Sequence, residues 1–315
     1  MSPVDPLFAS KFHLFDGIAP DATREEWAPR VMPQFEAGQS EYVSPPVTVE
    51  NRTIPGPQGE IPVRIYTPQD ASTNHPGLVW YHGGAFMFGD LDMKEADVVS
   101  REIAHRANAV VMSVDYRLVT PDRKFPTSQI DGLAAAQWFV ENAEVLGVNP
   151  NQITISGASA GACLTASVVL QLRDRGQLEG IRNILIYPIA HSDLPEFSDE
   201  LSSKIAVVPP QLVFSRPDTK WINSNMGYET VDASYHCFPG DSADHSGLPE
   251  TLIINSEYDS LRASGERYFE QLQNAGVKVS QITAYGAMHG HLNWNPADCA
   301  VMDETLEQMV EFIAR

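Results

Sequence analysis

The sequence predicts an α/β fold with a mostly parallel central sheet, helices on both of its faces and a helical cap. Three observations support this prediction. Short apolar runs alternate with longer amphipathic stretches from about residue 78 onward, as strands and helices do in a parallel sheet. The runs AVVMSV and NILIY are apolar throughout, which is typical of strands buried on both faces. A proline-rich stretch between residues 194 and 245 interrupts the alternation.

Hydrophobic periodicity and the positions of proline and glycine predict the individual elements. A helix is predicted over Ala22–Phe35, interrupted by Pro29 and Pro33. Two β-like runs, VTVENRTI and IPVRIYTP, then flank a Pro-Gly turn at residues 55–56. The alternating part contains strands predicted over Leu78–Trp80, Ala109–Tyr116, Ile153–Ser159, Asn183–Ala190, Thr251–Asp259 and Val277–Tyr285. Further helices are predicted over Met93–Ala107, Ser128–Leu146, Ala160–Arg173, Gly265–Ala275 and Glu304–Ile313.

These elements predict one catalytic core in two parts, residues 46–193 and 246–315, with a two-part cap. An insertion as long as residues 194–245 inside a regular α/β pattern is more often a functional lid or cap than an accident. We expect it to pack with residues 1–45 over the carboxyl edge of the sheet. Ligands of open parallel sheets bind beyond that edge, so site residues should follow strands directly.

Composition narrows the function classes. The chain has 315 residues, of which 43% are hydrophobic, enough to bury a sizeable core. Its net charge of −20, from 41 acidic and 21 basic residues, argues against nucleic acid as a partner. The three cysteines, Cys163, Cys237 and Cys299, are far apart, which favours a reducing compartment. We see neither a signal peptide nor a membrane span and expect a cytoplasmic protein without a cofactor.

Ser159 is the predicted nucleophile. It lies in Gly157-Ala158-Ser159-Ala160-Gly161, a G-x-S-x-G that follows a predicted strand and opens a predicted helix. A serine hydroxyl projects from so sharp a turn only if the residues two before and two after it are small, because neighbouring backbone passes close by. The Ala160 amide then lies at a helix N-terminus, where partial positive charge favours a developing oxyanion.

A second glycine pair follows another predicted strand. In His82-Gly83-Gly84-Ala85-Phe86, the two glycines let the backbone approach a ligand and turn its N–H groups inward. A tetrahedral oxyanion needs two or three such donors. We therefore predict an oxyanion hole formed by the amides of Gly83, Gly84 and Ala160. His82 is predicted to hold this loop in place and not to act as the base.

The acid and the base are expected downstream of Ser159. A nucleophilic serine needs a base, the base needs an orienting acid, and both follow the serine in this chain order. Asp259 and His289 come after predicted strands in that order. Glu257 and His291, each two residues away, satisfy the same criteria, so the residues alone leave both choices open. The His289-x-His291 pair has no further ligand motif beside it, and no metal site is predicted.

Taken together, these segments resemble the hormone-sensitive-lipase-like esterases, including their bacterial carboxylesterase branch. The likeness runs from about residue 60 to about residue 295. The family's HGGG, YRLAPE-x-x-FP, GDSAGG, D-P-L and HGF motifs correspond in order to His82–Ala85, Asp115–Pro126, Gly157–Ala162, Asp259–Leu261 and His289–His291. The resemblance implies the α/β-hydrolase fold with a helical cap. It also implies Asp259 as the acid and His289 as the base.

The chain departs from the family pattern at several positions. Ala85 replaces the third glycine of the oxyanion loop and adds a methyl group that limits bulky alcohol groups. Ala158 and Ala162 replace the Asp and the last Gly around the nucleophile, and one residue near Thr120 is extra. None of these changes removes a predicted triad group. The candidate substrate contacts are Phe86, Met87, Phe214 and Trp221.

These observations predict a serine carboxylesterase that hydrolyses small to medium carboxylic esters through a Ser159–His289–Asp259 triad and an acyl-enzyme. An amidase, acyltransferase or dehydratase using the same triad stays open, as does a non-catalytic ligand-binding protein of the same fold. The plant gibberellin receptor resembles the family but lacks the base, whereas His289 occupies that position here. The predicted partner is a small-molecule ester, and the resemblance also allows a homodimer through the edge strand after Ala275.

Overall fold

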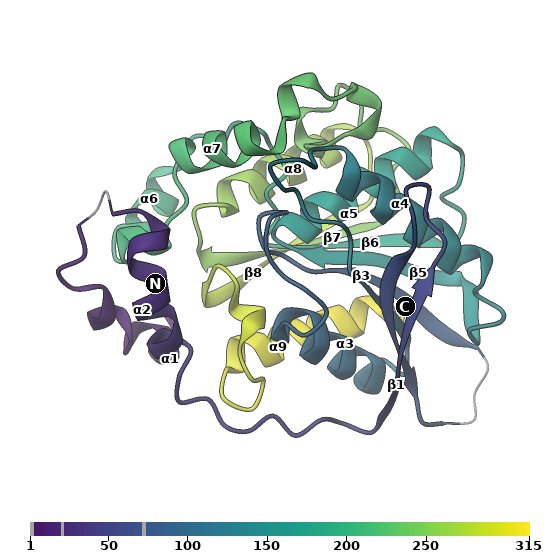
Figure 1. Cartoon of the computed structure of the whole chain (residues 1–315), viewed down its shortest axis with the longest axis horizontal. Coiled ribbons are helices and arrows are strands. Elements are labelled where there is room, and N and C mark those ends of the chain that lie inside the picture. Colours follow the sequence, from purple (N-terminus) through teal and green to yellow (C-terminus); the bar gives the residue numbers. More distant parts are fainter. Residues whose placement is uncertain (1–2, 20–21, 71–73) are drawn as a thin grey trace.

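The computed structural model describes residues 3–19, 22–70 and 74–315, and an eight-stranded sheet runs through its middle (Figure 1). The strand order is β1-β2-β4-β3-β5-β6-β7-β8. β2 pairs antiparallel with β1 and β4, and the remaining neighbours are parallel, which confirms the predicted α/β fold with a mostly parallel sheet. The strands are β1 (Val47–Ile54), β2 (Ile61–Pro68), β3 (His75–Tyr81), β4 (Val110–Val114), β5 (Val148–Ala158), β6 (Ile181–Ile186), β7 (Thr251–Tyr258) and β8 (Val279–Met288).

Helices cover both faces of this sheet. Leu78 and Trp80 of β3 pack in one apolar cluster with α3 and α9, whereas Val79 and Tyr81 point to the other face and pack with α4 and α5. This alternation is the two-residue period of a strand buried on both sides. No helix among the described residues is long and apolar enough to cross a membrane. The covering helices are α3 (Lys94–Arg106), α4 (Thr127–Glu141), α5 (Ala160–Asp174), α8 (Arg262–Asn274) and α9 (Ala300–Ile313).

The N-terminal helix α2 (Arg24–Phe35) differs from its prediction, because Pro29 and Pro33 lie inside it without ending it. Each proline removes one backbone hydrogen bond. The helix is held instead by a capping box at Thr23 and by a stripe of buried side chains spaced four residues apart, Trp27, Val31 and Phe35. Burial of that stripe therefore outweighs the two missing hydrogen bonds.

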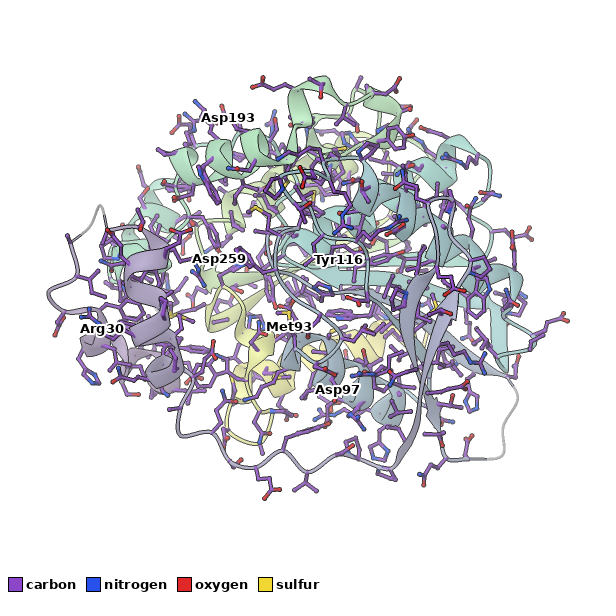
Figure 2. All side chains as sticks on the ribbon, in the orientation of Figure 1. Arg30, Met93, Asp97, Tyr116, Asp193 and Asp259 are labelled. Carbon is purple, nitrogen blue, oxygen red and sulfur yellow. The ribbon has the colours of Figure 1, made fainter. Side chains whose placement is uncertain are left out.

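The carboxyl ends of the parallel strands point toward the side of the molecule that holds the N-terminal helices and the proline-rich insertion (Figure 1). The insertion contains α6 (Asp199–Ile205) and α7 (Arg216–Met226), and the N-terminal segment begins with α1 (Pro6–Ala9). The two segments touch, since the Gln211 amide donates a hydrogen bond of 3.2 Å to the Ile18 carbonyl oxygen. Asp259 lies in the interior near this end of the sheet (Figure 2).

A buried ion pair fixes the chain between β4 and α4. The Asp131 carboxylate is fully buried and accepts hydrogen bonds from the backbone amide and the guanidinium of Arg117. The Ser128 hydroxyl donates to the Arg117 carbonyl oxygen at 2.8 Å. Breaking a buried pair by removing one partner leaves an uncompensated charge, which costs more than the pair itself contributes.

Arg117→Met is therefore expected to lower the free energy of unfolding by about 3 kcal/mol, because it leaves Asp131 buried without a cation. Urea unfolding followed by circular dichroism measures the change. Arg267→Met is the matched control, since Arg267 and Glu270 form an exposed pair with side-chain exposures of 58% and 62%. The control should lose less than about 1 kcal/mol. Equal losses in the two variants would show that burial of Asp131 is unimportant.

Candidate active site

Ser159 lies at a sharp turn between β5, which ends at Ala158, and α5, which begins at Ala160. Its backbone angles are φ 56° and ψ −117°, a left-handed conformation that side-chain-bearing residues rarely adopt. Such strain costs on the order of 1–3 kcal/mol and persists only where the surroundings impose it. Here the Ser159 amide donates a hydrogen bond of 2.9 Å to the Ile186 carbonyl oxygen of β6.

The two glycines of the motif make this turn possible. A Cβ atom on Gly161 would lie 2.0 Å from the Tyr81 carbonyl oxygen, and one on Gly157 would lie 2.5 Å from the Gly161 carbonyl oxygen. Both contacts are with backbone, which cannot move aside as a flexible side chain would. The sequence argument that these positions must be small therefore has a direct steric cause.

The structure brings Ser159, His289 and Asp259 together. Ser159 Oγ lies 3.0 Å from His289 Nε2, and His289 Nδ1 lies 2.6 Å from Asp259 Oδ2. Because a carboxylate only accepts hydrogen bonds, the imidazole proton belongs on Nδ1, which leaves Nε2 to accept the serine hydroxyl proton. Asp259 is 2% exposed, and its other oxygen accepts the Leu261 amide at 2.9 Å. The carboxylate is thus held in place from both sides.

Glu257 has other partners. It is buried and forms an ion pair with Lys204 of α6. Its second oxygen accepts the Gly286 amide at 2.7 Å. The side chain therefore joins the insertion to β7 and β8 instead of facing His289.

His291 is also committed elsewhere. It is fully buried, with Nδ1 at 3.1 Å from Ser256 Oγ and Nε2 at 2.9 Å from Thr305 Oγ1. Burial lowers the pKa of this imidazole to about 3, so it is neutral at ordinary pH. Neither ring nitrogen reaches Ser159.

Among the described residues, no group of three side chains of the metal-ligating types His, Cys, Asp and Glu could hold a metal ion.

The oxyanion loop follows β3, and one of its predicted donors is already used. The buried Gly83 amide donates its hydrogen bond to Oε1 of Glu95, so it has no proton left for a substrate oxygen. The prediction that Gly83 contributes to the oxyanion hole is therefore wrong. Gly84, at φ 111°, turns the chain, and its carbonyl oxygen accepts the Met87 and Phe88 amides. Ala160 is the first residue of α5, where no carbonyl of the same helix faces its amide.

His82 holds this loop, as predicted. Its ring stacks on Tyr116 with a centroid distance of 4.5 Å, and its Nδ1–H donates to the Gly83 carbonyl oxygen at 2.6 Å. The Tyr116 hydroxyl donates to the His82 carbonyl oxygen at 2.7 Å. Burial lowers the pKa of His82, so the ring stays neutral and serves packing and hydrogen bonding.

The four candidate substrate contacts have different surroundings. Phe86 is 1% exposed and packs edge-on against Phe125 in the core, so its proposed contact with substrate is wrong. Trp221 is 54% exposed, and none of the contacts among the described residues joins its ring to the triad, so its place over the site stays a prediction. Met87 is partly buried beside the core. Phe214 is partly buried, and its ring lies edge-on to His289 with a centroid distance of 5.0 Å.

Sequence reasoning missed several residues that surround the triad. Tyr187 lies inside the strand predicted over Asn183–Ala190, whereas β6 ends at Ile186, so the rule that site residues come after strands does not select it from the sequence. Its ring lies 4.9 Å from the His289 ring. The sequence does not single out Glu95, because an acidic residue in the first turn of a helix usually lies in solvent and interacts only with the helix dipole. Ser260 belongs to the acid motif Asp259–Leu261, and its Oγ also accepts the Phe214 amide at 2.9 Å.

The strand–turn–helix elbow and the sheet define the class as α/β hydrolases, and a family model described as having the alpha/beta hydrolase fold matches residues 78–293. The chain belongs to this family, in its hormone-sensitive-lipase-like branch, as the resemblance implied.

Known relatives cover most of the chain. It is 36% identical over 257 residues to carboxylesterase NlhH of Mycobacterium tuberculosis, covering 79% of this chain and 77% of the relative. It is 31% identical over 306 residues to arylacetamide deacetylase of Bos taurus, covering 79% and 76%. A solved esterase of Pyrobaculum calidifontis is 29% identical, with a TM-score of 0.81 over 99% of this chain and 98% of that one.

The low pKa of His291 predicts a contribution to acid sensitivity. Its pKa is about 3 in the folded chain and near 6.5 when exposed, so between these values the unfolded chain binds a proton that the folded chain does not. Stability therefore falls as pH drops through this window. His291→Gln removes the effect, and its stability relative to the parent should rise by up to about 1.4 kcal/mol per pH unit from pH 6 to pH 4. Urea unfolding at each pH measures this, and parallel curves would contradict it.

Proposed function

We propose that the chain is a serine carboxylesterase that hydrolyses small to medium carboxylic esters through Ser159, His289 and Asp259. The observation that carries the proposal is the continuous pair of short contacts, 3.0 Å and 2.6 Å, that joins the serine hydroxyl to the imidazole and the imidazole to the carboxylate. Relatives named as carboxylesterases and esterases support ester bonds as the target.

The proposed reaction uses two acyl transfers. Ser159 Oγ attacks the ester carbonyl carbon while His289 Nε2 takes the hydroxyl proton, and the same nitrogen then protonates the departing alcohol. A water molecule, deprotonated by His289, hydrolyses the acyl-enzyme and restores the serine. The buried Asp259 carboxylate stabilises the imidazolium that forms in each step.

The oxyanion is held by backbone donors in this proposal. Ala160 and Gly84 keep the roles expected of them, because neither amide has an acceptor among the contacts of the described residues. The next loop amide, Ala85, takes the place first assigned to Gly83. Ala85 has a left-handed φ of 52°, so its methyl group stands where the loop would otherwise be glycine. Preorganised donors of this kind contribute about 3–4 kcal/mol each to transition-state stabilisation.

We propose that residues 1–45 and 194–245 form a cap that limits substrate size. Two contacts fasten the insertion to the segment that carries Asp259: the buried Lys204–Glu257 ion pair and the hydrogen bond from the Phe214 amide to Ser260 Oγ. They support a wall at Phe214, beside His289. The net charge of −20 favours neutral or cationic esters over anionic ones. Cytoplasmic location and a homodimer stay predictions.

Ser159→Ala tests the reaction directly. Turnover of p-nitrophenyl acetate should fall about 10⁴-fold or more, because the nucleophile is removed while the fold is kept. A fluorophosphonate probe should label the parent chain on Ser159, as peptide mass spectrometry would show, and leave the variant unlabelled. Ser246→Ala, an exposed serine, is the control and should behave as the parent does. Undiminished turnover in S159A would eliminate the scheme, and failure to label an inactive parent would favour a ligand-binding protein.

An amide substrate is the second candidate, because one relative is named arylacetamide deacetylase. The same three side chains can serve either bond. Comparison of p-nitrophenyl acetate with p-nitroacetanilide separates the two activities, and an added acceptor alcohol reveals acyl transfer. We expect kcat/KM to favour the ester, since an alkoxide or phenoxide leaves more readily than an amide nitrogen.

Phe214→Ala is expected to widen the acyl or alcohol pocket, because it removes the ring beside His289. The ratio of kcat/KM for p-nitrophenyl octanoate to that for the acetate should rise about tenfold, the lower end of the effect of one methylene group in an apolar pocket. Trp221→Ala is the matched control, since this exposed side chain lies on the same insertion. An unchanged ratio in F214A, or an equal rise in W221A, would show that Phe214 is not the wall.

A further inference from the structure

Glu95 is a buried carboxylate whose partners are all hydrogen-bond donors. It lies in the first turn of α3 and is 2% exposed. Carboxylates are almost never fully buried unless they are paired. Here Oε1 accepts the Gly83 amide, and Oε2 accepts the Tyr187 hydroxyl at 2.6 Å and the Asn293 side-chain amide at 3.3 Å. Three donors around two oxygens satisfy a carboxylate that acts only as an acceptor.

The three donors come from three loops that surround Ser159. Gly83 belongs to the loop after β3, and Tyr187 follows β6 with its ring 4.9 Å from the His289 ring. Asn293 follows β8, and its side-chain amide also lies 3.3 Å from the Gly290 carbonyl oxygen, next to His289. One carboxylate therefore joins the oxyanion loop to both sides of the base.

The contact with Gly83 sets the direction of the oxyanion loop. A Cβ atom on Gly83 would lie 3.2 Å from Ser159 Cβ and 2.7 Å from Glu95 Oε1, so the loop is confined between the nucleophile and the carboxylate. On the other side, the Gly84 carbonyl oxygen is fixed by the Met87 and Phe88 amides. The Gly84 N–H shares its peptide plane with the Gly83 carbonyl oxygen, which accepts the His82 Nδ1–H. Glu95 and the Met87 and Phe88 amides hold the peptide planes on either side, so these contacts together set the direction of the Gly84 amide.

We propose that Glu95 is a positioning residue for the oxyanion hole, which aims the Gly84 amide by holding the Gly83 amide away from the substrate. The inference rests on the proposed esterase function, because it concerns the stabilisation of that reaction's oxyanion. Glu95 itself does not touch the substrate. Its loss should therefore lower kcat, which depends on the oxyanion, and leave KM largely unchanged.

Glu95→Ala removes the acceptor, and Glu95→Gln keeps the shape but replaces one acceptor oxygen by a donor. We expect kcat for p-nitrophenyl acetate to fall about 100-fold in E95A and about 10-fold in E95Q, with KM within threefold of the parent. The second readout is inhibition by a trifluoromethyl ketone. When Ser159 Oγ bonds to the carbonyl carbon of this ketone, the serine hydroxyl proton passes to His289 and the ketone oxygen becomes an oxyanion. Its inhibition constant should rise in parallel with the loss of kcat.

Glu102 supplies a matched control on the same helix. It is 7% exposed and likewise accepts a tyrosine hydroxyl, that of Tyr42 at 2.8 Å, but its other partner is Arg106 and it lies outside the site. Glu102→Ala should lower the melting temperature of the protein, as E95A does, while its kcat stays within threefold of the parent. A loss of kcat in E102A as large as in E95A would show that any damage to α3 has this effect, and would overturn the proposal.

The remaining outcomes of these experiments also support or refute the role of Glu95. If E95A does not fold, E95Q and Tyr187→Phe carry the test, and kcat within threefold of the parent in both would refute the role of Glu95. A rise in KM with unchanged kcat would refute it as well, because it would place Glu95 in ground-state binding. Failure of the proposed function looks different, since the parent chain would then lack turnover and fluorophosphonate labelling at Ser159.

Discussion

The left-handed backbone of Ser159 is the constraint on which the site depends. A serine at φ 56° is held there by the hydrogen bond of its amide to β6 and by the approach of β3 and α5, which Gly157 and Gly161 permit. The same turn points the hydroxyl at His289 and places the Ala160 amide at the start of α5. The strained backbone of Ser159 therefore positions both the nucleophile and an oxyanion donor, and the parallel sheet is the rigid frame that maintains this strain.

Three buried carboxylates lie around this turn, and each has a different role because it has different partners. Asp259 faces an imidazole, Glu257 faces the Lys204 ammonium of the insertion, and Glu95 faces only neutral donors. Each position follows from what its oxygens accept, since a buried acceptor without a donor is strongly unfavourable. In our account the first assists proton transfer, the second fastens the cap and the third aims the oxyanion loop.

Much of this arrangement could be predicted from the sequence, because parallel strands bring their carboxyl ends to one edge and chain order restricts the choices. Ser159, Asp259 and His289 each follow a strand and do meet. The direction of a single amide is not encoded in glycine content, which is why Gly83 was misassigned. The pattern also does not encode the left-handed φ of 61° with which Phe86 packs into the core. The exposure of Trp221 agrees with the helical period of α7, whose buried positions are Thr219, Ile222, Asn223 and Met226.

The central claim is that one strained serine and its backbone donors form a working acyl-transfer site. A crystal structure of the chain inactivated with a p-nitrophenyl phosphonate tests it most directly. We predict phosphorus bonded to Ser159 Oγ, the phosphoryl oxygen within hydrogen-bonding distance of the Gly84 and Ala160 amides, and the Gly83 amide still on Glu95. Phosphorus bonded to another residue, or a phosphoryl oxygen turned away from those amides, would contradict the account.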